Sequence, residues 1–253
     1  MSRPIARYGW NPDLPDFRDL HFSASADVVG TLPERVDLRE QCPPVYDQGQ
    51  LGSCTANAIG AMLQFDQKKQ KETDFEPSRL FIYYGERDME GTIGSDSGAM
   101  IRDGIKVVNA LGAPPETDWP YDIQKFADKP PQQAYDDAQM HQALQYQRIP
   151  RDLNQMKGCL ASSLPFVFGF RVYESFESAE VADTGRAPLP EPGEKALGGH
   201  AVMAVGYNQR IDRFIVRNSW GTGWGRDGYF SLPFAYLLNR GLSSDFWSIQ
   251  LVE

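Results

Sequence analysis

In the first two-thirds of the chain, apolar residues recur at helical spacing. Between Thr55 and Lys69 the apolar positions are Ala58, Ile59, Met62, Leu63 and Phe65, and this period of three to four residues predicts a helix. Similar patterns, helped by a first-turn proline or a closing glycine, predict further helices at Pro77–Arg87, Ala99–Leu111 and Asp152–Ser162. The polar segment Pro130–Gln147 has no clear period and is compatible with a partial helix.

The last third of the chain has the pattern of β-structure. Short runs rich in β-branched and aromatic residues predict five strands, at Pro165–Tyr173, His200–Asn208, Arg213–Trp220, Gly228–Pro233 and Phe246–Val252. A polar excursion from Glu174 to Gly199 separates the first two strands. Helices followed by strands predict an α+β fold with a cleft between a helical half and a sheet half.

Residues 1–31 read as an extended leader. Its three prolines exclude a regular helix, and its aromatic residues are candidate anchors to the body of the protein: Trp10, Phe17 and Phe22. Two interpretations stay open. The leader is either a clasp that stabilises the fold, which we favour, or a short pro-segment that lies across the cleft and inhibits.

Composition narrows the function classes. The 253 residues are 41% apolar and 12% aromatic, which is typical of a folded globular protein. With 34 acidic and 25 basic residues the net charge is −9, which argues against nucleic-acid or membrane partners. The chain start lacks a signal-peptide pattern and favours the cytoplasm, with another export route or a trimmed signal as alternatives. Cys42 and Cys159 are able to pair, but a count of three cysteines favours free thiols.

Cys54 stands at the predicted start of the Thr55–Lys69 helix. The free N–H groups and partial positive charge of a helix N-terminus stabilise a thiolate, so the sequence predicts a lowered pKa for this thiol and exposure in the cleft. The plainer alternative is a small buried packing residue.

The chain has only three histidines as candidates for a base that accepts the Cys54 proton. His200 opens an apolar strand after "LGG", and Asn218 ends the next strand, where its amide would accept a hydrogen bond from the imidazole. Trp220 and Trp224 would shelter that bond from water. Read separately, Asn218 is equally compatible with a turn, and the tryptophans with a packed core.

Together these segments resemble the papain-like cysteine peptidases. The similarity rests on "DQGQLGSCTANAIG", "GHAVMAVGYN" and "NSWGTGWGRDGYF", supported by "LPERVDLRE", "GSDSG" and "WPYD", and it covers about residues 32–253. It implies a peptidase domain over 32–253 with a helical N-terminal lobe, an antiparallel sheet or barrel as C-terminal lobe, and the active site between them.

The resemblance also implies a cysteine endopeptidase acting on peptides or proteins, monomeric, without cofactor or metal. Cys54 would be the nucleophile, His200 the base and Asn218 the group that orients it, with Gln48 in the oxyanion hole. The implied substrate-binding residues are Ser95, Asp96, Ser97, Gly98, Gly198, Gly199, Ala201 and Trp220. The alternatives are an acyl transferase or peptide ligase with the same triad, and a non-catalytic binding or inhibitory module.

The chain departs from the family pattern beside the nucleophile. Leu51 stands where the family usually has a disulfide-forming cysteine, and the region around "GSDSG" has no partner cysteine. Thr55 replaces the usual aromatic residue, which predicts a more open cleft on the leaving-group side. Gly199 is also smaller than usual.

Overall fold

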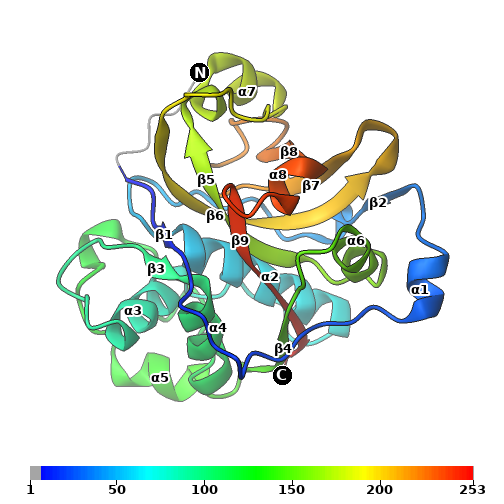
Figure 1. The fold of residues 1–253 in the computed structure, drawn as a ribbon. Coiled ribbons are helices and arrows are strands. Elements are labelled where there is room, and N and C mark those ends of the chain that lie inside the picture. The colour runs from blue at the N-terminus through cyan, green and yellow to red at the C-terminus, as the bar shows by residue number, and fades with distance from the viewer. Residues whose placement is uncertain (1–6, 253) are drawn as a thin grey trace.

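The computed structural model describes residues 7–252 as a helical half packed against a sheet half (Figure 1). The helical half contains α2 (Cys54–Gln70), α3 (Arg79–Met89), α4 (Ile101–Ala110) and α5 (Gln132–Ala138). Every residue of α2 from Cys54 to Gln67 is buried, because this helix lies between the other helices and the sheet. Its N-terminus is thereby fixed where the two halves meet.

The sheet half is one seven-stranded antiparallel sheet. Its strands are β2 (Arg35–Asp37), β4 (Ala143–Arg148), β5 (Phe166–Tyr173), β6 (Ala196–Asn208), β7 (Arg213–Arg217), β8 (Tyr229–Pro233) and β9 (Ser243–Val252). The strand order is β4-β9-β5-β6-β7-β8, and β2 also pairs with β6. Over the part of the chain that the structure describes, this sheet stays open and does not close into the barrel that the resemblance allowed.

All four predicted helices and all five predicted strands are present, with shifted ends. α6 (Leu153–Ala161) is the fourth of those helices. The segment Pro130–Gln147 contains a helix, α5, as the sequence allowed, and also most of β4, which ends one residue beyond it. β4 exists because β9 supplies its hydrogen-bond partners from far along the chain, which no local pattern can reveal. The polar excursion contains α7 (Ala179–Thr184), and α8 (Phe234–Leu238) follows β8.

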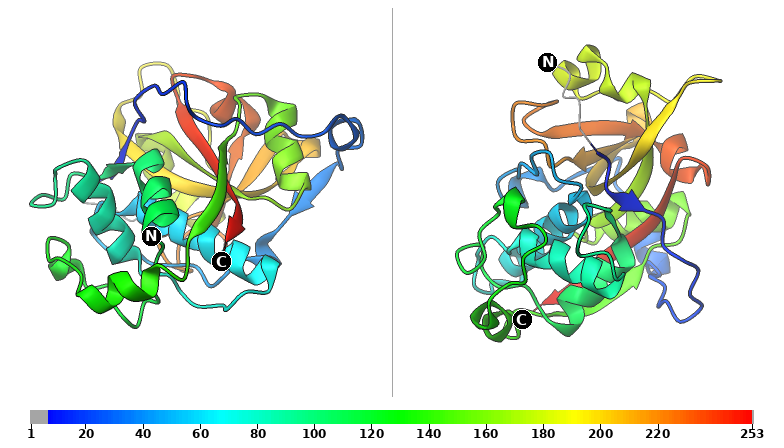
Figure 2. Two further views of the ribbon diagram at one scale, coloured as in Figure 1. Left: turned by 90° about the horizontal axis from the view of Figure 1, so that it is seen from below. Right: turned by 90° about the vertical axis from the view of Figure 1, so that its left-hand side faces the viewer.

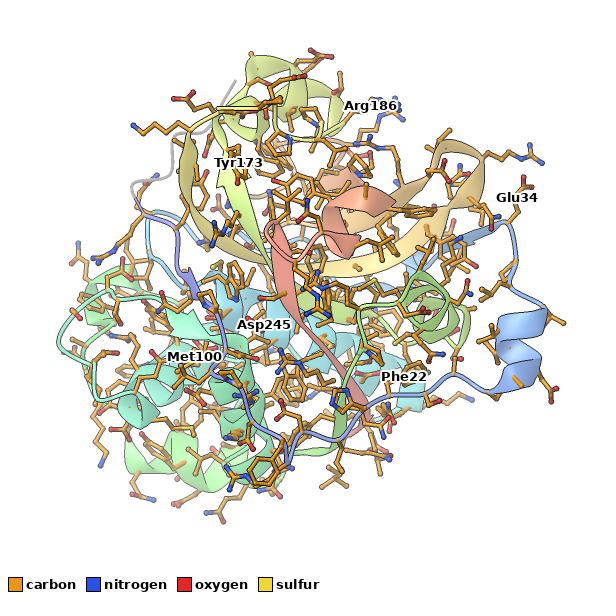
Figure 3. All side chains as sticks on the ribbon, in the orientation of Figure 1. Phe22, Glu34, Met100, Tyr173, Arg186 and Asp245 are labelled. Atoms are coloured by element: carbon orange, nitrogen blue, oxygen red, sulfur yellow. The ribbon has the colours of Figure 1, made fainter. Side chains whose placement is uncertain are left out.

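The leader runs across the front of the molecule and between its two halves (Figures 1 and 2). It forms β1 (Trp10–Asn11), which pairs in parallel with β3 (Ala99–Met100), and then α1 (Ala26–Gly30). The expectation of a leader without any helix is wrong at α1, where the Ser25 side chain caps a helix that lies beyond the prolines. Phe22, labelled in Figure 3, is buried as predicted, but Phe17 is fully exposed.

Cys42, Cys54 and Cys159 are all free and buried. Two of them donate to backbone carbonyls, Cys42 to Leu38 and Cys159 to Leu164. No helix among residues 7–252 is both long enough and apolar enough to cross a membrane.

Candidate active site

Cys54 is the first residue of α2 and its side chain has no exposed surface. The backbone N–H groups of Gly9, Thr55 and Ala201 lie close enough to the thiol to favour its charged form and so lower its pKa. Burial nevertheless raises the pKa of the Cys54 thiol to about 12. The sequence predicted a lowered pKa and an exposed thiol, and both predictions fail in this state because the leader, through Gly9, covers the sulfur.

His200 and Asn218 meet across neighbouring antiparallel strands. His200 lies on β6 and Asn218 directly follows β7, and His200 Nε2 is 2.8 Å from Asn218 Oδ1. The Trp220 ring stacks on the imidazole, with centroids 4.9 Å apart and planes inclined by 28°. Burial lowers the pKa of His200 to about 4, and the Asn218 hydrogen bond opposes that shift only partly.

Gln48 lies in the loop that leads to the nucleophile and is buried. Its Oε1 accepts a hydrogen bond from Ser219 Oγ at 2.6 Å, and its Nε2 donates to the carbonyl of Leu51 at 2.9 Å. Ser219 follows Asn218 in the chain. The same short segment after β7 therefore holds both the Gln48 amide and the His200 ring.

The predicted substrate-binding residues form two opposite walls. On the helical side, Asp96 points into the protein, where it accepts hydrogen bonds from Gly52 N–H at 3.0 Å and Tyr83 Oη at 2.5 Å. The Ser95 and Ser97 hydroxyls donate only to the nearby Thr92 and Gly98, and the Ser97 carbonyl accepts from Asn11 Nδ2 of the leader at 3.2 Å. Asp96 therefore supports the wall instead of facing a substrate.

On the sheet side, Gly198, Gly199 and Ala201 lie on β6 beside the leader. A Cβ at Gly198 would collide with the Tyr8 ring, and a Cβ at Gly199 with the Trp10 ring. Small residues at these positions are thus what lets the leader approach the sheet.

The leader fills the space between the walls. A Cβ at Gly9 would overlap the carbonyl oxygen of Gly52, two residues before the nucleophile. The Gly9 carbonyl accepts from Ala99 N–H at 2.8 Å, and the Tyr8 ring contacts His200 with centroids 6.0 Å apart. Trp10 is 6% exposed and donates from Nε1 to Asp245 Oδ2 at 3.2 Å.

Sequence reasoning missed the residues that support the site from a distance. Tyr83 donates a hydrogen bond to Asp96. Asp245 accepts hydrogen bonds from two groups of the leader, Trp10 Nε1 and the Asp13 backbone N–H. Thr55 is buried and donates to Glu86 Oε2 at 2.7 Å. The prediction that Thr55 opens the cleft is therefore wrong. No spacing signals these pairs, because their members are brought together only by tertiary packing.

No group of three or more His, Cys, Asp or Glu residues within 7–252 is arranged to hold a metal ion. The chemistry that the site can support comes from a thiol, an imidazole and amide donors. A helical half carrying the thiol, opposite an antiparallel sheet carrying the imidazole and its amide partner, is the architecture of a thiol peptidase.

Comparison with known proteins identifies the family. The family model described as papain family cysteine protease matches residues 32–237, and the chain belongs to that family. It is a papain-like cysteine peptidase, a hydrolase.

Two similar proteins match nearly the whole chain. The crystal structure of xylellain, a cysteine protease from Xylella fastidiosa, is 45% identical, with a TM-score of 0.91 over 97% of this chain and 96% of that one. An uncharacterized peptidase C1-like protein of Acanthamoeba polyphaga mimivirus is 43% identical over 97% of this chain and 87% of its own length. A probable cysteine protease of Arabidopsis thaliana is 30% identical over 81% of this chain, which spans 44% of that relative. The first two similarities include the leader region as well as the peptidase domain.

Proposed function

We propose that the chain hydrolyses peptide bonds with Cys54 as nucleophile, His200 as base and acid, and Asn218 as the residue that orients the ring. The observation that carries the proposal is the 2.8 Å contact between His200 Nε2 and Asn218 Oδ1. This contact occupies Nε2 with the Asn218 amide. Nδ1 has no hydrogen-bond partner within 7–252, so it is the nitrogen that can exchange a proton with the thiol.

Each residue then has a defined role in the reaction. His200 takes the Cys54 proton as sulfur attacks the carbonyl carbon, and returns it to the leaving amine. The Gln48 amide and the Cys54 N–H stabilise the negative oxygen, and one such donor contributes about 3 kcal/mol. Water then attacks the acyl-enzyme, with His200 again as base. The neutral Asn218 orients the ring without adding a negative charge beside the thiolate.

Residues 8–13 of the leader act in this proposal as an inhibitory segment. What supports this is the position of Gly9 against both Cys54 and Gly52, since a substrate carbonyl needs the space beside the thiol. Burial under the leader also favours the uncharged thiol and imidazole, because both ions lose hydration there. Peptide cleavage therefore requires this segment to leave. The same leader still acts as a clasp further along, where Phe22 is buried.

The test is cleavage of a diverse peptide library, with products read by mass spectrometry. Cys54→Ser is expected to abolish cleavage, and Asn218→Ala to lower kcat at least about tenfold with a smaller change in KM, because the ring loses its orientation. Measurements are made on the full-length chain and on Gly9→Leu, in which the leader no longer fits. Full activity in Asn218→Ala would refute its role.

The same assay separates the alternatives. With a free amine added, a hydrolase still releases mainly the acid product, whereas an acyl transferase or ligase joins the acyl group to the amine. A non-catalytic module would leave the library intact in every variant, including Gly9→Leu.

A further inference from the structure

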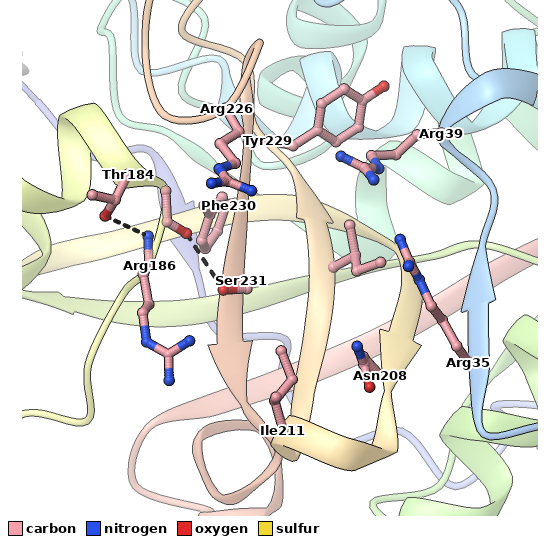
Figure 4. A pocket seen from close by; sticks show the side chains of 12 residues that line it. Arg35, Arg39, Thr184, Arg186, Asn208, Ile211, Arg226, Tyr229, Phe230 and Ser231 are labelled. Atoms are coloured by element: carbon pink, nitrogen blue, oxygen red, sulfur yellow. Dashed lines mark hydrogen bonds between the residues drawn. The ribbon is translucent and has the colours of Figure 1, made fainter.

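A second cavity lies on the outer part of the sheet, away from the catalytic residues. Its volume is about 330 Å3, and it is lined by β2, β7, β8, the end of α7 and the loop before β8 (Figure 4). Gln48, Cys54, His200 and Asn218 do not line it. Cleavage of a peptide in the cleft leaves this cavity without a role.

Four arginines from three parts of the chain face this cavity. They are Arg35, Arg39, Arg186 and Arg226. Arg35 and Arg39 share one carboxylate, Asp37, at 2.8 and 2.7 Å. The side chains of Arg186 and Arg226 make no hydrogen bond or ion pair with another residue within 7–252. Two guanidinium groups thus keep their full donor capacity for a ligand.

The wall behind these arginines adds another positive charge. The buried Arg213 donates to Ser231 Oγ at 2.9 Å and to the carbonyl oxygens of Ser231 and Ala187, none of which carries a charge. Burial, together with the smaller effect of the nearby Arg186 charge, lowers the pKa of Arg213 to about 10. In this group of arginines, Asp37 pairs with Arg35 and Arg39, and Asp227 acts on Arg39 from further away. A chain of net charge −9 therefore keeps a local excess of positive charge here.

The lining also has an apolar part, beside the polar Thr184, Asn208 and Ser231. Ile211, Ile215 and Phe230 contribute hydrocarbon, and Tyr229 presents a ring whose centroid is 5.8 Å from the Arg39 guanidinium carbon. A cavity that combines a few fixed charges with an apolar surface is typical of sites for small organic molecules. A bare ion would leave that apolar surface without a partner.

We propose that this cavity binds a small organic phosphate, with the phosphate between Arg186 and Arg226 and an apolar or planar group against Ile211, Ile215 and Tyr229. A phosphomonoester carries about two negative charges at neutral pH, which match the two unpaired guanidinium groups. The planar fork of arginine donates two parallel hydrogen bonds to phosphate oxygens.

Titration calorimetry at low salt tests the proposal on the full-length chain. Phenyl phosphate is the probe, inorganic phosphate the probe without the ring, and phenol the probe without the charge. Phenyl phosphate is expected to bind saturably and several-fold more tightly than inorganic phosphate, and phenol is expected not to bind. Arg186→Gln and Arg226→Gln are each expected to weaken phenyl phosphate about tenfold or more, since each removes charge-assisted hydrogen bonds.

The matched control is Arg240→Gln, an exposed arginine that does not line this cavity. It should leave the affinity unchanged. Because Arg186 and Arg226 bind no neighbour, their variants should keep the wild-type melting temperature. The proposal fails if no saturable binding is seen at millimolar phenyl phosphate, or if both arginine variants bind like wild type. It also fails if inorganic phosphate or an acidic peptide binds more tightly than phenyl phosphate.

Discussion

Two neighbouring stretches of the leader have similar residue types and opposite environments. Residues 8–13 lie in the cleft, where Trp10 is buried and Asp13 accepts from Arg102 N–H and Trp247 Nε1. Residues 14–21 run over the surface, with Leu14 68%, Phe17 100% and Leu20 69% exposed.

The two stretches meet different polar groups. Asp245 accepts from both Trp10 Nε1 and the Asp13 backbone N–H, and Arg148 donates to its other oxygen at 2.9 Å. The outer stretch is held by the Asp19 side chain, through Arg102 and Arg148, and by the Leu14 and Leu20 carbonyls, which accept from the same two arginines. Hydrogen bonds to a buried carboxylate hold both stretches, Asp245 for the first and Asp19 for the second. The stretches differ in their apolar side chains, which are buried in the first at Trp10 and add nothing to the attachment of the second.

Gly9→Leu should have the largest effect on the inner stretch, residues 8–13. Any side chain at Gly9 overlaps the carbonyl oxygen of Gly52, so residues 8–13 must leave the cleft. Overpacking costs about 1–3 kcal/mol or more, which predicts a rise in peptide cleavage of up to about a hundredfold. Initial rates with a small fluorogenic peptide measure it.

The matched control is Gly30→Leu, which changes the same leader at a position with open space around it. Its cleavage rate should equal that of wild type. If Gly9→Leu only lowers the melting temperature and leaves cleavage unchanged, residues 8–13 do not inhibit.

The protonation state of His200 reports whether the leader covers the site. With the leader in place, burial lowers the pKa of His200 to about 4 and raises that of Cys54 to about 12. Neither group then changes charge between about pH 5 and 8, although an ordinary histidine titrates within this range. Nitrogen-15 NMR of the ring should show a neutral His200 throughout this range in wild type and an imidazolium in Gly9→Leu. A wild-type ring that becomes protonated near pH 6.5 would contradict the closed state.

Asp245→Asn should have a smaller effect in the same direction. The amide keeps one acceptor oxygen but turns an NH2 group toward an existing donor, either Arg148 or the leader, and it removes the charge. Loss of such hydrogen bonds costs about 1.5–3 kcal/mol, which predicts a roughly tenfold rise in cleavage. Asp16→Asn, in the outer stretch and paired only with Arg18, should leave cleavage unchanged. Equal rates in the two variants would show that Asp245 does not hold the leader.

The sequence predicted elements and motifs better than it predicted environments. The helix that begins at Cys54 and the meeting of His200 with Asn218 follow from local periodicity and a recognisable motif. The covered state of Cys54 does not, because it depends on Gly9, 45 residues earlier by number, fitting against Gly52. The burial of Trp10 and the exposure of Phe17 could not be predicted either, because both are aromatic residues among prolines. Only Trp10 has a buried carboxylate, Asp245, within hydrogen-bond distance.

Phe17→Ser should have the smallest effect of all on stability and cleavage. The side chain is fully exposed, so replacing it loses no buried apolar surface. Surface substitutions of this kind change the free energy of unfolding by no more than about 0.5 kcal/mol. Both the melting temperature and the cleavage rate should therefore equal those of wild type. Phe22→Ser, at a buried position of the same leader, is the variant to compare with Phe17→Ser. It should lower the melting temperature by several degrees, because burying a large aromatic side chain contributes about 1.5–3 kcal/mol. If Phe17→Ser destabilised the protein as much as Phe22→Ser, the outer stretch would have to pack against the body in solution, and the leader would act as one continuous clasp.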